Sequence, residues 1–253
     1  MLRGLLRPRW ILVHVGVAAL VTLMVNLAFW QAHRLEERQE FNATVTARSA
    51  VGLAPLPRLA TQAPTDPDSV EWRRVMVSGT YEPGDAVTIV NRSSNGTAGY
   101  NQVVPFRADG VGTVLVNRGF VPLGTEPDAG IPDGPVEVAG YLRVSQTRGT
   151  LGAVDSTDPG TVEFQRIDIP LISRSIGVDM FPMYLQLIAE SPSPGGTWPA
   201  PVAFPELSEG SHRSYVFQWA FFSLVAAAAW VVVVRRKWRA GVPVSGTPGQ
   251  TSA

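Results

Sequence analysis

A histidine and several aromatic residues lie close together at 211–222, where a long polar section of the chain gives way to an apolar one. At about 100° per residue, a helix places His212, Tyr215 and Trp219 within about 60° of one direction. A neutral imidazole coordinates iron, and broad aromatic side chains pack against a flat ring. This face could therefore bind a flat apolar ligand with a metal at its centre. The same face also includes Val216, Ser223 and Trp230.

A second interpretation of these residues needs no ligand. Tyrosine and tryptophan are enriched where membrane helices enter the bilayer, so Tyr215 and Trp219 could be interfacial anchors. His212 would then be an ordinary polar residue at the start of a helix. The spacing alone is consistent with both interpretations.

Catalysis by the common routes has little support in the sequence. All three histidines, His14, His33 and His212, lie in or beside apolar stretches, so a Ser-His-Asp relay in the polar section would lack its base. The chain has no cysteine, which excludes disulfides and thiolate catalysis. We therefore expect a protein that is not an enzyme.

Two apolar stretches must position these residues. Ile11–Trp30 and Tyr215–Val234 contain no charged residue, and about 20 helical residues cover the roughly 30 Å hydrocarbon core of a bilayer. The first run is too long for a cleaved signal peptide, so we expect an uncleaved anchor. The sequence therefore predicts transmembrane helices at 11–31 and 212–234.

The charges around the two spans indicate their orientation. All 21 acidic residues lie between Glu36 and Glu209. Basic residues in short flanking segments favour the cytoplasmic side, so both termini should be cytoplasmic and the acidic middle section outside. No amphipathic, Arg-rich presequence precedes the first span, which favours a bacterial plasma membrane over a mitochondrial one. The flanking basic residues are Arg3, Arg7, Arg9, Arg235, Arg236, Lys237 and Arg239.

Small and polar residues recur at four-residue steps in the first span. This ridge, formed by His14, Ala18, Thr22 and Asn26, should face another helix, because small side chains let helix backbones approach within a membrane. Its expected partner is the Ala226–Ala229 run of the second span. On this interpretation His14 and Asn26 form hydrogen bonds between helices and are not ligands.

The middle section has the alternating pattern of a β domain. Short apolar runs alternate with turn signals such as Asn95-Gly96 and Pro132-Asp133-Gly134, which close hairpins. Glycines within the runs, at positions 79, 99, 119 and 140, should serve the backbone geometry of a curved sheet. We expect two transmembrane α-helices flanking a mostly-β, antiparallel extracytoplasmic domain with a short helix, whose sheet either stays open or closes into a barrel. The expected segments are a cytoplasmic N-terminus (1–10), the first span (11–31), a helical extension with a Pro-rich linker (32–69), the β domain (70–190), a Pro/Gly-rich return loop (191–211), the second span (212–234) and a basic cytoplasmic tail (235–253).

Several motifs occur together in an order that resembles the surfeit locus family of cytochrome oxidase assembly factors. The chain shares with that family two spans around one outer domain and motifs distributed from about Phe29 to Trp219. Two of them together argue against a chance match: the run Val116–Pro122 in the middle of this stretch and the pattern His212-x-x-Tyr215-x-x-x-Trp219 at its end. The other matching segments are 29–34, 77–81, 99–105 and 138–143.

The resemblance implies a protein that helps to build a haem–copper terminal oxidase by handling haem a for insertion into its catalytic subunit. In the family, the histidine at the start of the second span is the proposed haem a ligand, and His212 occupies that position. Tyr215 and Trp219 would shape the haem surface. The implied partners are the catalytic subunit, other oxidase or respiratory subunits and the lipid bilayer; no nucleic acid is expected.

Four further residues could complete such a site. Gln31 and Arg34 lie at headgroup level, where they could cap the haem propionates, although Arg34 could also bind lipid phosphate. His33 could be a second axial ligand if the two spans pack together. Arg118 could pair with a propionate or an acidic partner through its guanidinium, or it could be a structural arginine that binds backbone carbonyls.

Two other functions remain open. The chain could stay bound as an accessory subunit of the mature oxidase or of a larger respiratory assembly, with its acidic outer domain holding partners. A more distant alternative is a ligand-sensing outer domain that signals to a separate cytoplasmic protein.

Overall fold

The computed structural model describes residues 7–240. Arg3 of the expected N-terminal segment and residues 241–253 of the expected tail lie outside the described residues. The chain divides into two compact units. One contains the residues up to Ala43 together with those from Leu207 onward, and the other is Thr44–Glu206.

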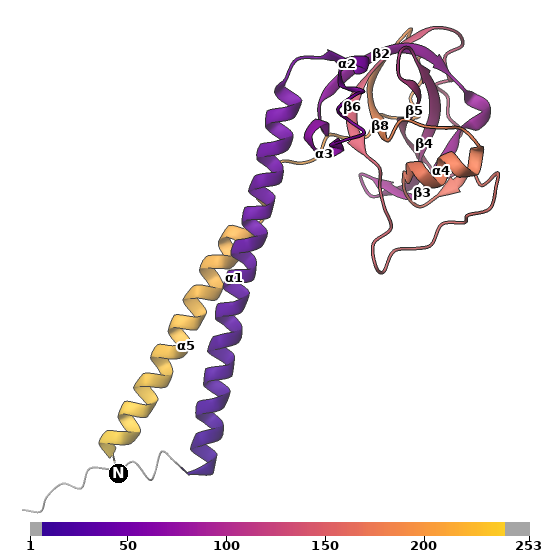
Figure 1. Ribbon diagram of the computed structural model, residues 1–253. Coiled ribbons are helices and arrows are strands. Elements are labelled where there is room, and N and C mark those ends of the chain that lie inside the picture. Colours follow the sequence, from indigo (N-terminus) through magenta and orange to yellow (C-terminus); the bar gives the residue numbers. More distant parts are fainter. Residues whose placement is uncertain (1–6, 241–253) are drawn as a thin grey trace, which may run out of the picture. The chain divides into compact units, whose positions relative to one another are not determined.

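The first unit is built from two long helices, α1 (Pro8–Ala50) and α5 (His212–Ala240), which lie side by side (Figure 1). Both are long and apolar enough to cross a membrane. Pro8 suits the first turn of α1, where a missing N–H costs nothing, and α1 ends shortly before Gly52. This confirms the prediction of two long apolar helices at the two ends of the chain.

The two helices meet along a seam with a seven-residue repeat. Along α1, the side chains withdrawn from the surface include Val17, Met24 and Gln31, a spacing of 3.5 residues per turn that is typical of helices packing as a coiled coil. Other residues of the same seam are His14, Val21, Ala28 and Leu35 on α1, and His212, Val216, Ser223 and Trp230 on α5.

The predicted ridge on α1 is wrong except for His14. Ala18, Thr22 and Asn26 are exposed, and the Asn26 amide donates to the Thr22 carbonyl of its own helix at 2.8 Å. Steps of four residues advance by about 40° around a helix, so three steps move a residue well away from the seam. His14 does face α5, because its Nδ1 accepts a hydrogen bond from Trp230 Nε1 at 3.1 Å.

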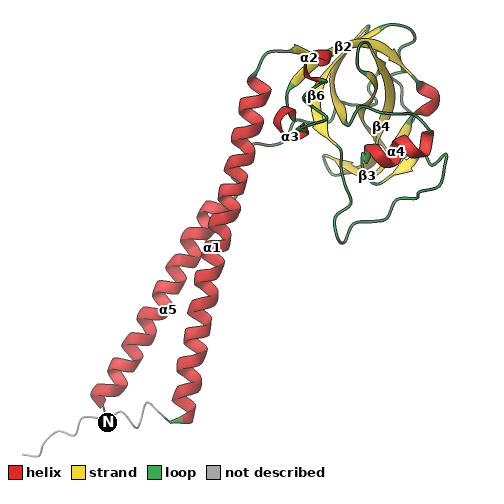
Figure 2. Ribbon diagram, in the orientation of Figure 1, coloured by secondary structure: helices red, strands yellow, loops and turns green. Residues whose placement is uncertain are grey.

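The second unit is an eight-stranded sheet whose pairings form a closed ring. Its strands follow the order β1-β2-β6-β8-β5-β4-β3-β7, and an additional pairing joins β2 to β4. The ring β2-β6-β8-β5-β4 is therefore a small barrel, with β1, β3 and β7 added at its margin (Figure 2). The bounds are β1 (Ala54–Pro55), β2 (Arg74–Tyr81), β3 (Val87–Ser94), β4 (Thr97–Ala108), β5 (Gly112–Pro122), β6 (Val136–Val144), β7 (Glu163–Phe164) and β8 (Met183–Ser191), with short helices α2 (Leu56–Leu59), α3 (Pro67–Val70), η2 (Pro83–Asp85) and α4 (Ile169–Ile176).

The mostly antiparallel β domain with one short helix is confirmed, and the structure adds three parallel pairings. β1 pairs with β2, β7 with β3, and β8 with β5 in the parallel sense. Hairpin turn signals predict only neighbours in sequence, whereas β8 returns from a distant part of the chain to join β5. Because β8 lies between β6 and β5, it connects the two parts of the sheet and allows the ring to close.

Glycine permits the barrel to close where β2 meets β4. Gly79 pairs with Ala108, and a Cβ on Gly79 would lie 2.1 Å from the Arg107 carbonyl oxygen. Cβ atoms at Gly99, Gly119 and Gly140 would also lie within 2.8 Å of a backbone oxygen. The expected geometric role of these glycines is thus confirmed, since no side chain fits where the backbones approach.

Two hydrophobic clusters fill the β domain. The larger includes Val75, Phe106, Leu142 and Leu185, from four of the barrel strands. The smaller lies where α4 covers the sheet and includes Ile89, Leu115 and Ile172. α4 begins where the Asp168 side chain accepts the Leu171 N–H and ends at Gly177, whose φ of 72° suits glycine.

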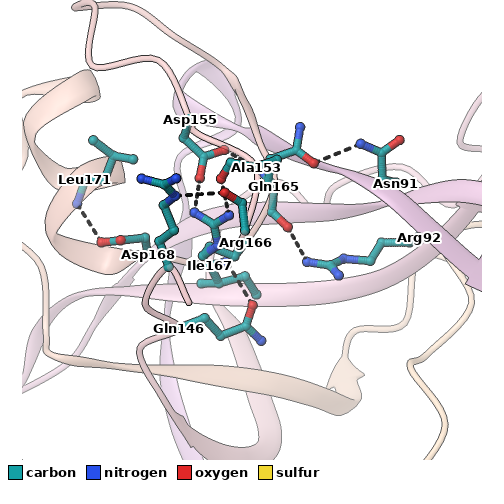
Figure 3. Close-up of polar contacts among 12 residues, drawn as sticks. Asn91, Arg92, Gln146, Ala153, Asp155, Gln165, Arg166, Ile167, Asp168 and Leu171 are labelled. Carbon is teal, nitrogen blue, oxygen red and sulfur yellow. Dashed lines mark hydrogen bonds and ion pairs between the residues drawn. The ribbon is translucent and has the colours of Figure 1, made fainter. Parts of the chain in front are cut away.

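A long segment between β6 and α4 is ordered by one buried ion pair. Asp155 binds the Arg166 guanidinium at 2.6 Å and also accepts the Gln165 N–H (Figure 3). Arg166 further donates to the Ala153 carbonyl. Asp155 and Arg166 are mostly buried, with side-chain exposures of 3% and 13%. Asp155 thus binds the N–H of Gln165, the residue that directly follows β7.

The segment after β8 packs back onto the barrel. Ala200 and Phe120 exchange two backbone hydrogen bonds, and the Asp128 carboxylate accepts the N–H groups of Thr197 and Trp198. These two backbone donors hold the pKa of Asp128 below its ordinary value. Phe204 then packs against Trp72 and Tyr141. This part of the expected return loop is therefore a fixed part of the β domain.

Candidate functional site

His212 is the first residue of α5, and its imidazole turns toward α1. Its Nδ1 lies 2.8 Å from the Oε1 of Gln31. Gln31 is only 9% exposed, although both neighbours on its helix, Trp30 and Ala32, are less buried. A buried amide oxygen facing a ring nitrogen is satisfied when that nitrogen carries the proton. The contact is a hydrogen bond when the His212 Nδ1–H donates to the Gln31 oxygen.

The His212 ring lines a hollow, and its Cδ2–Nε2 edge faces Gly210. Gly210 approaches this edge, because a Cβ built on Gly210 would lie 3.6 Å from His212 Cδ2 and 3.9 Å from Nε2. The hollow encloses about 360 Å³ and is lined by Arg34, Glu37, Arg38, Phe41, Gly210 and His212. A ligand in this hollow would therefore lie beside the His212 ring.

Charged side chains line the polar end of this hollow. Arg34 forms an ion pair with Glu37 one turn away. Arg38 donates to the Ser208 carbonyl at 3.3 Å, and its guanidinium lies 5.6 Å from the centre of the Phe41 ring. Arg34 and Arg38 therefore bring two guanidinium groups to the lining of this hollow. A ligand with carboxylate groups would complement them.

Tyr215 and Trp219 lie on one flank of the face that His212 presents. On the helix, Tyr215 is about 60° to one side of His212, and Ala220 about 80° to the other. Tyr215 is 42% exposed. Trp219 is half-buried and packs edge-on against Phe222, with 6.3 Å between the two ring centroids. Both rings are available to an additional ligand, because neither is enclosed between the two helices.

An apolar groove of about 290 Å³ opens between the helices one turn further along α5. Val216, Ala220 and Ser223 of α5 face Val25, Ala28, Phe29 and Ala32 of α1. Neither Tyr215 nor Trp219 lines it. Trp230 lies about 27 Å from His212 along the helix axis, at 1.5 Å per residue, and binds His14 instead. Trp230 therefore does not belong to the aromatic face beside His212.

His33 points away from His212. It lies about 200° around α1 from Gln31, and its ring contacts Glu37 at 3.3 Å and Glu36 at 3.9 Å on the same helix. Its side chain is 70% exposed. The structure therefore does not bring the two imidazoles together.

Arg118 is located in the other unit, in the interior of the β domain. It is 1% exposed and binds Glu190 at 2.7 Å, Gln102 at 3.0 Å and the Gly130 carbonyl at 2.9 Å. The Tyr81 hydroxyl donates to the same carboxylate at 2.6 Å. Burial, and after it the charge of Glu190, raises the pKa of Tyr81, so the phenol stays protonated and remains a donor.

The contacts of Arg118 fit the second interpretation from the sequence, a structural arginine that binds groups of its own domain. Its guanidinium is paired with one carboxylate, and its two terminal nitrogens also bind Gln102 and the Ala129 and Gly130 carbonyls. Within residues 7–240, its Nε has no hydrogen-bond partner. A propionate would have to displace Glu190 from a buried ion pair, which is strongly unfavourable. We therefore leave Arg118 out of the site proposed below.

Among residues 7–240, no three His, Cys, Asp or Glu side chains are grouped so that they could hold a bare metal ion. One imidazole, cationic side chains and two accessible aromatic rings suit a haem, whose macrocycle provides four ligands and whose edge carries carboxylates.

Sequence reasoning placed Gln31 at this end of the chain but missed its contact with His212. The signal is present in the seam: Gln31 occupies the seven-residue repeat that runs through Val17 and Met24, so it must face the partner helix. A polar residue at such a position requires a polar partner across the seam. His212 is the residue that begins the partner helix at that level.

The comparisons with known proteins agree with these motifs. Residues 18–224 match the SURF1 family. A SURF1-like protein of Mycobacterium tuberculosis is 29% identical over 260 residues, which cover 96% of this chain and 92% of that protein. Surfeit locus protein 1 of Homo sapiens is 25% identical over 255 residues, which cover 93% of this chain and 79% of that protein. A SURF1-like protein of Monosiga brevicollis is 28% identical over 242 residues, with coverages of 90% and 87%. Because the matched region spans most of its length, the chain belongs to the SURF1 family.

Proposed function

We propose that this protein binds haem a through His212 and delivers it to the catalytic subunit of a haem–copper oxidase during assembly. The family is linked generally to cytochrome oxidase assembly. The observation that carries the finer proposal is the orientation of His212, whose Nδ1 faces Gln31 and whose ring lines a hollow together with Arg34 and Arg38.

A delivery protein must hold its cargo and then release it. If His212 alone held the haem iron, a histidine of the receiving subunit could compete with it for the cargo. The exposure of His33 and its contacts with Glu36 and Glu37 support ligation by one histidine. Bound haem supplies the redox-active iron that the oxidase requires; this chain's own residues bind, orient and release it.

The remaining residues have distinct roles in this proposal. Tyr215 and Trp219 cover part of the macrocycle with their exposed ring faces. Arg34, with Arg38, lies beside the propionate edge, where a guanidinium can bind a carboxylate in bidentate fashion. The Glu37 partner of Arg34 keeps this attraction moderate, which suits a cargo that has to leave.

We place the protein in a bacterial plasma membrane with both helices spanning it. The basic residues Arg235, Arg236 and Lys237 follow the apolar part of α5, so the positive-inside tendency puts this end in the cytoplasm. The β domain then lies outside, and so does the His212 end of α5. Haem would therefore be bound near the outer surface of the bilayer.

Oxidase assembly in cells provides the test. In a strain whose only copy carries His212→Ala, oxidase should contain less haem a per catalytic subunit than in the wild type. His14→Ala is the matched control, because it removes a histidine from the same helix pair at its other end. Full haem a content in the His212→Ala strain, or in a strain that lacks the protein, would contradict the proposal. Stoichiometric retention of the protein on fully haemylated oxidase would instead indicate an accessory subunit.

A further inference from the structure

We infer that Gln31 is a positioning residue for the iron ligand: it holds the His212 imidazole in the tautomer protonated on Nδ1 and presents Nε2 to the hollow. This inference rests on the proposed function for its biological meaning. The geometry on which it depends, a buried amide bound to a ring nitrogen, is independent of haem.

The position of Gln31 restricts what its side chain can do. It lies in the seam between α1 and α5 and is 9% exposed, so water satisfies little of its amide. In the spanning part of a helix pair, an unpaired amide oxygen would be costly. The Nδ1 of His212, 2.8 Å away, is the partner that the described residues provide for Oε1. The contact therefore restrains both side chains.

The restraint determines which nitrogen can bind iron. A neutral imidazole has one protonated nitrogen and one nitrogen with a lone pair, and the hydrogen bond at one of them fixes the identity of the other. An amide oxygen can only accept, so Nδ1 carries the proton. Nε2 is then the only ring atom able to coordinate a metal. Without Gln31, both tautomers become accessible and the ring can rotate about its Cβ–Cγ bond.

The same hydrogen bond tunes the ligand electronically. Histidine ligands of metals commonly donate their second N–H to a carbonyl or carboxylate, which raises the basicity of the coordinating nitrogen. A carboxylate in place of the Gln31 amide would strengthen the effect by giving the ring more imidazolate character. An apolar side chain of similar volume would abolish it. Glu and Leu at position 31 therefore change the same contact in opposite directions.

The first experiment needs no haem. In haem-free protein in detergent, nitrogen NMR of His212, identified by its disappearance in His212→Ala, should show the Nδ1-protonated tautomer for the wild type. Gln31→Leu should show a mixture of the two tautomers. Asn26→Leu is the control, because Asn26 is a polar residue of the same helix that points away from the seam. A wild-type His212 that is protonated on Nε2, or a tautomer unchanged in Gln31→Leu, would overturn the inference.

The second experiment uses haem a as the probe. Gln31→Leu should weaken haem a binding by roughly 10- to 100-fold, the range found when such outer-sphere partners are removed, while Gln31→Glu retains binding. In the ferrous complex, the iron–histidine stretching frequency should rise in Gln31→Glu and fall in Gln31→Leu. Equal frequencies in all three proteins would overturn the role of Gln31. Failure of the wild type to bind haem a would instead overturn the proposed function, and the NMR result would remain valid.

Discussion

Arg118 offers a sharp test of how the β domain is stabilised. Arg118→Met removes the guanidinium and keeps most of the aliphatic volume. The substitution leaves the Glu190 carboxylate buried, with a side-chain exposure of 7%, and without its positive partner. It also removes the donors to the Gln102 side chain and the Gly130 carbonyl. The Tyr81 hydroxyl still donates to Glu190 but carries no charge.

The magnitude follows from this burial. Breaking a buried ion pair by removing one partner destabilises a protein by about 3–5 kcal/mol. For a domain of this size, each kcal/mol lowers Tm by about 2–4 °C. Arg118→Met should therefore lower the Tm of the β domain by roughly 6–20 °C. Adding Glu190→Gln should recover part of the loss, because a neutral amide tolerates burial better than an unpaired carboxylate.

An exposed ion pair of the same domain provides the control. Arg107 pairs with Glu82, but the Arg107 side chain is 69% exposed, and such pairs contribute only about 0–1 kcal/mol. Arg107→Met should therefore shift Tm by less than about 4 °C.

Thermal unfolding of the detergent-solubilised protein, followed by near-UV circular dichroism, measures both variants. Similar Tm values for Arg118→Met and the wild type would refute the reasoning. A changed haem spectrum in folded Arg118→Met would also contradict it, because it would assign Arg118 to the ligand site.

Two further predictions concern the β domain. Gly79→Ala should destabilise it by about 1–3 kcal/mol, because the added methyl group meets the Arg107 carbonyl. Gly84→Ala is the control and should not destabilise the domain, because the space beside Gly84 is open. Equal Tm shifts for the two variants would refute the argument from close backbone approach. Because the pKa of Asp128 is lowered in the folded protein, its contribution is present above the unfolded pKa of about 4 and is lost as pH falls through the folded value. Hydrogen exchange at Thr197 and Trp198, corrected for intrinsic rates, should lose protection on acidification in the wild type, and Asp128→Asn should weaken that pH dependence; identical pH profiles would contradict this role.

The sequence predicted most elements of the fold because their signals are local. Alternation and turn chemistry predicted a mostly antiparallel β domain, and the expected short helix corresponds to α4. Local patterns do not report which distant strands become neighbours. The parallel pairing of β8 with β5 and the closure of β2 on β4 therefore appear only in the structure.

The candidate site was predicted in part. His212, Tyr215 and Trp219 share a face by helical period alone, so their arrangement on α5 could be anticipated. The position of Gln31 opposite His212 depends on the phase between two helices, which the four-residue ridge assigned wrongly. Arg118 could not be assigned from the sequence: its neighbours Asn117 and Gly119 do not indicate whether its partner is a ligand or, as here, a glutamate 72 positions away.

The most direct test of the account is the absorption and resonance Raman spectrum of the purified protein with haem a. We predict that the wild type and His14→Ala bind about one haem a per chain and show an iron–histidine stretch in the ferrous state. His212→Ala should lose this stretch and most of the bound haem. Unchanged haem content and an unchanged stretch in His212→Ala would contradict the central claim that His212 holds the iron.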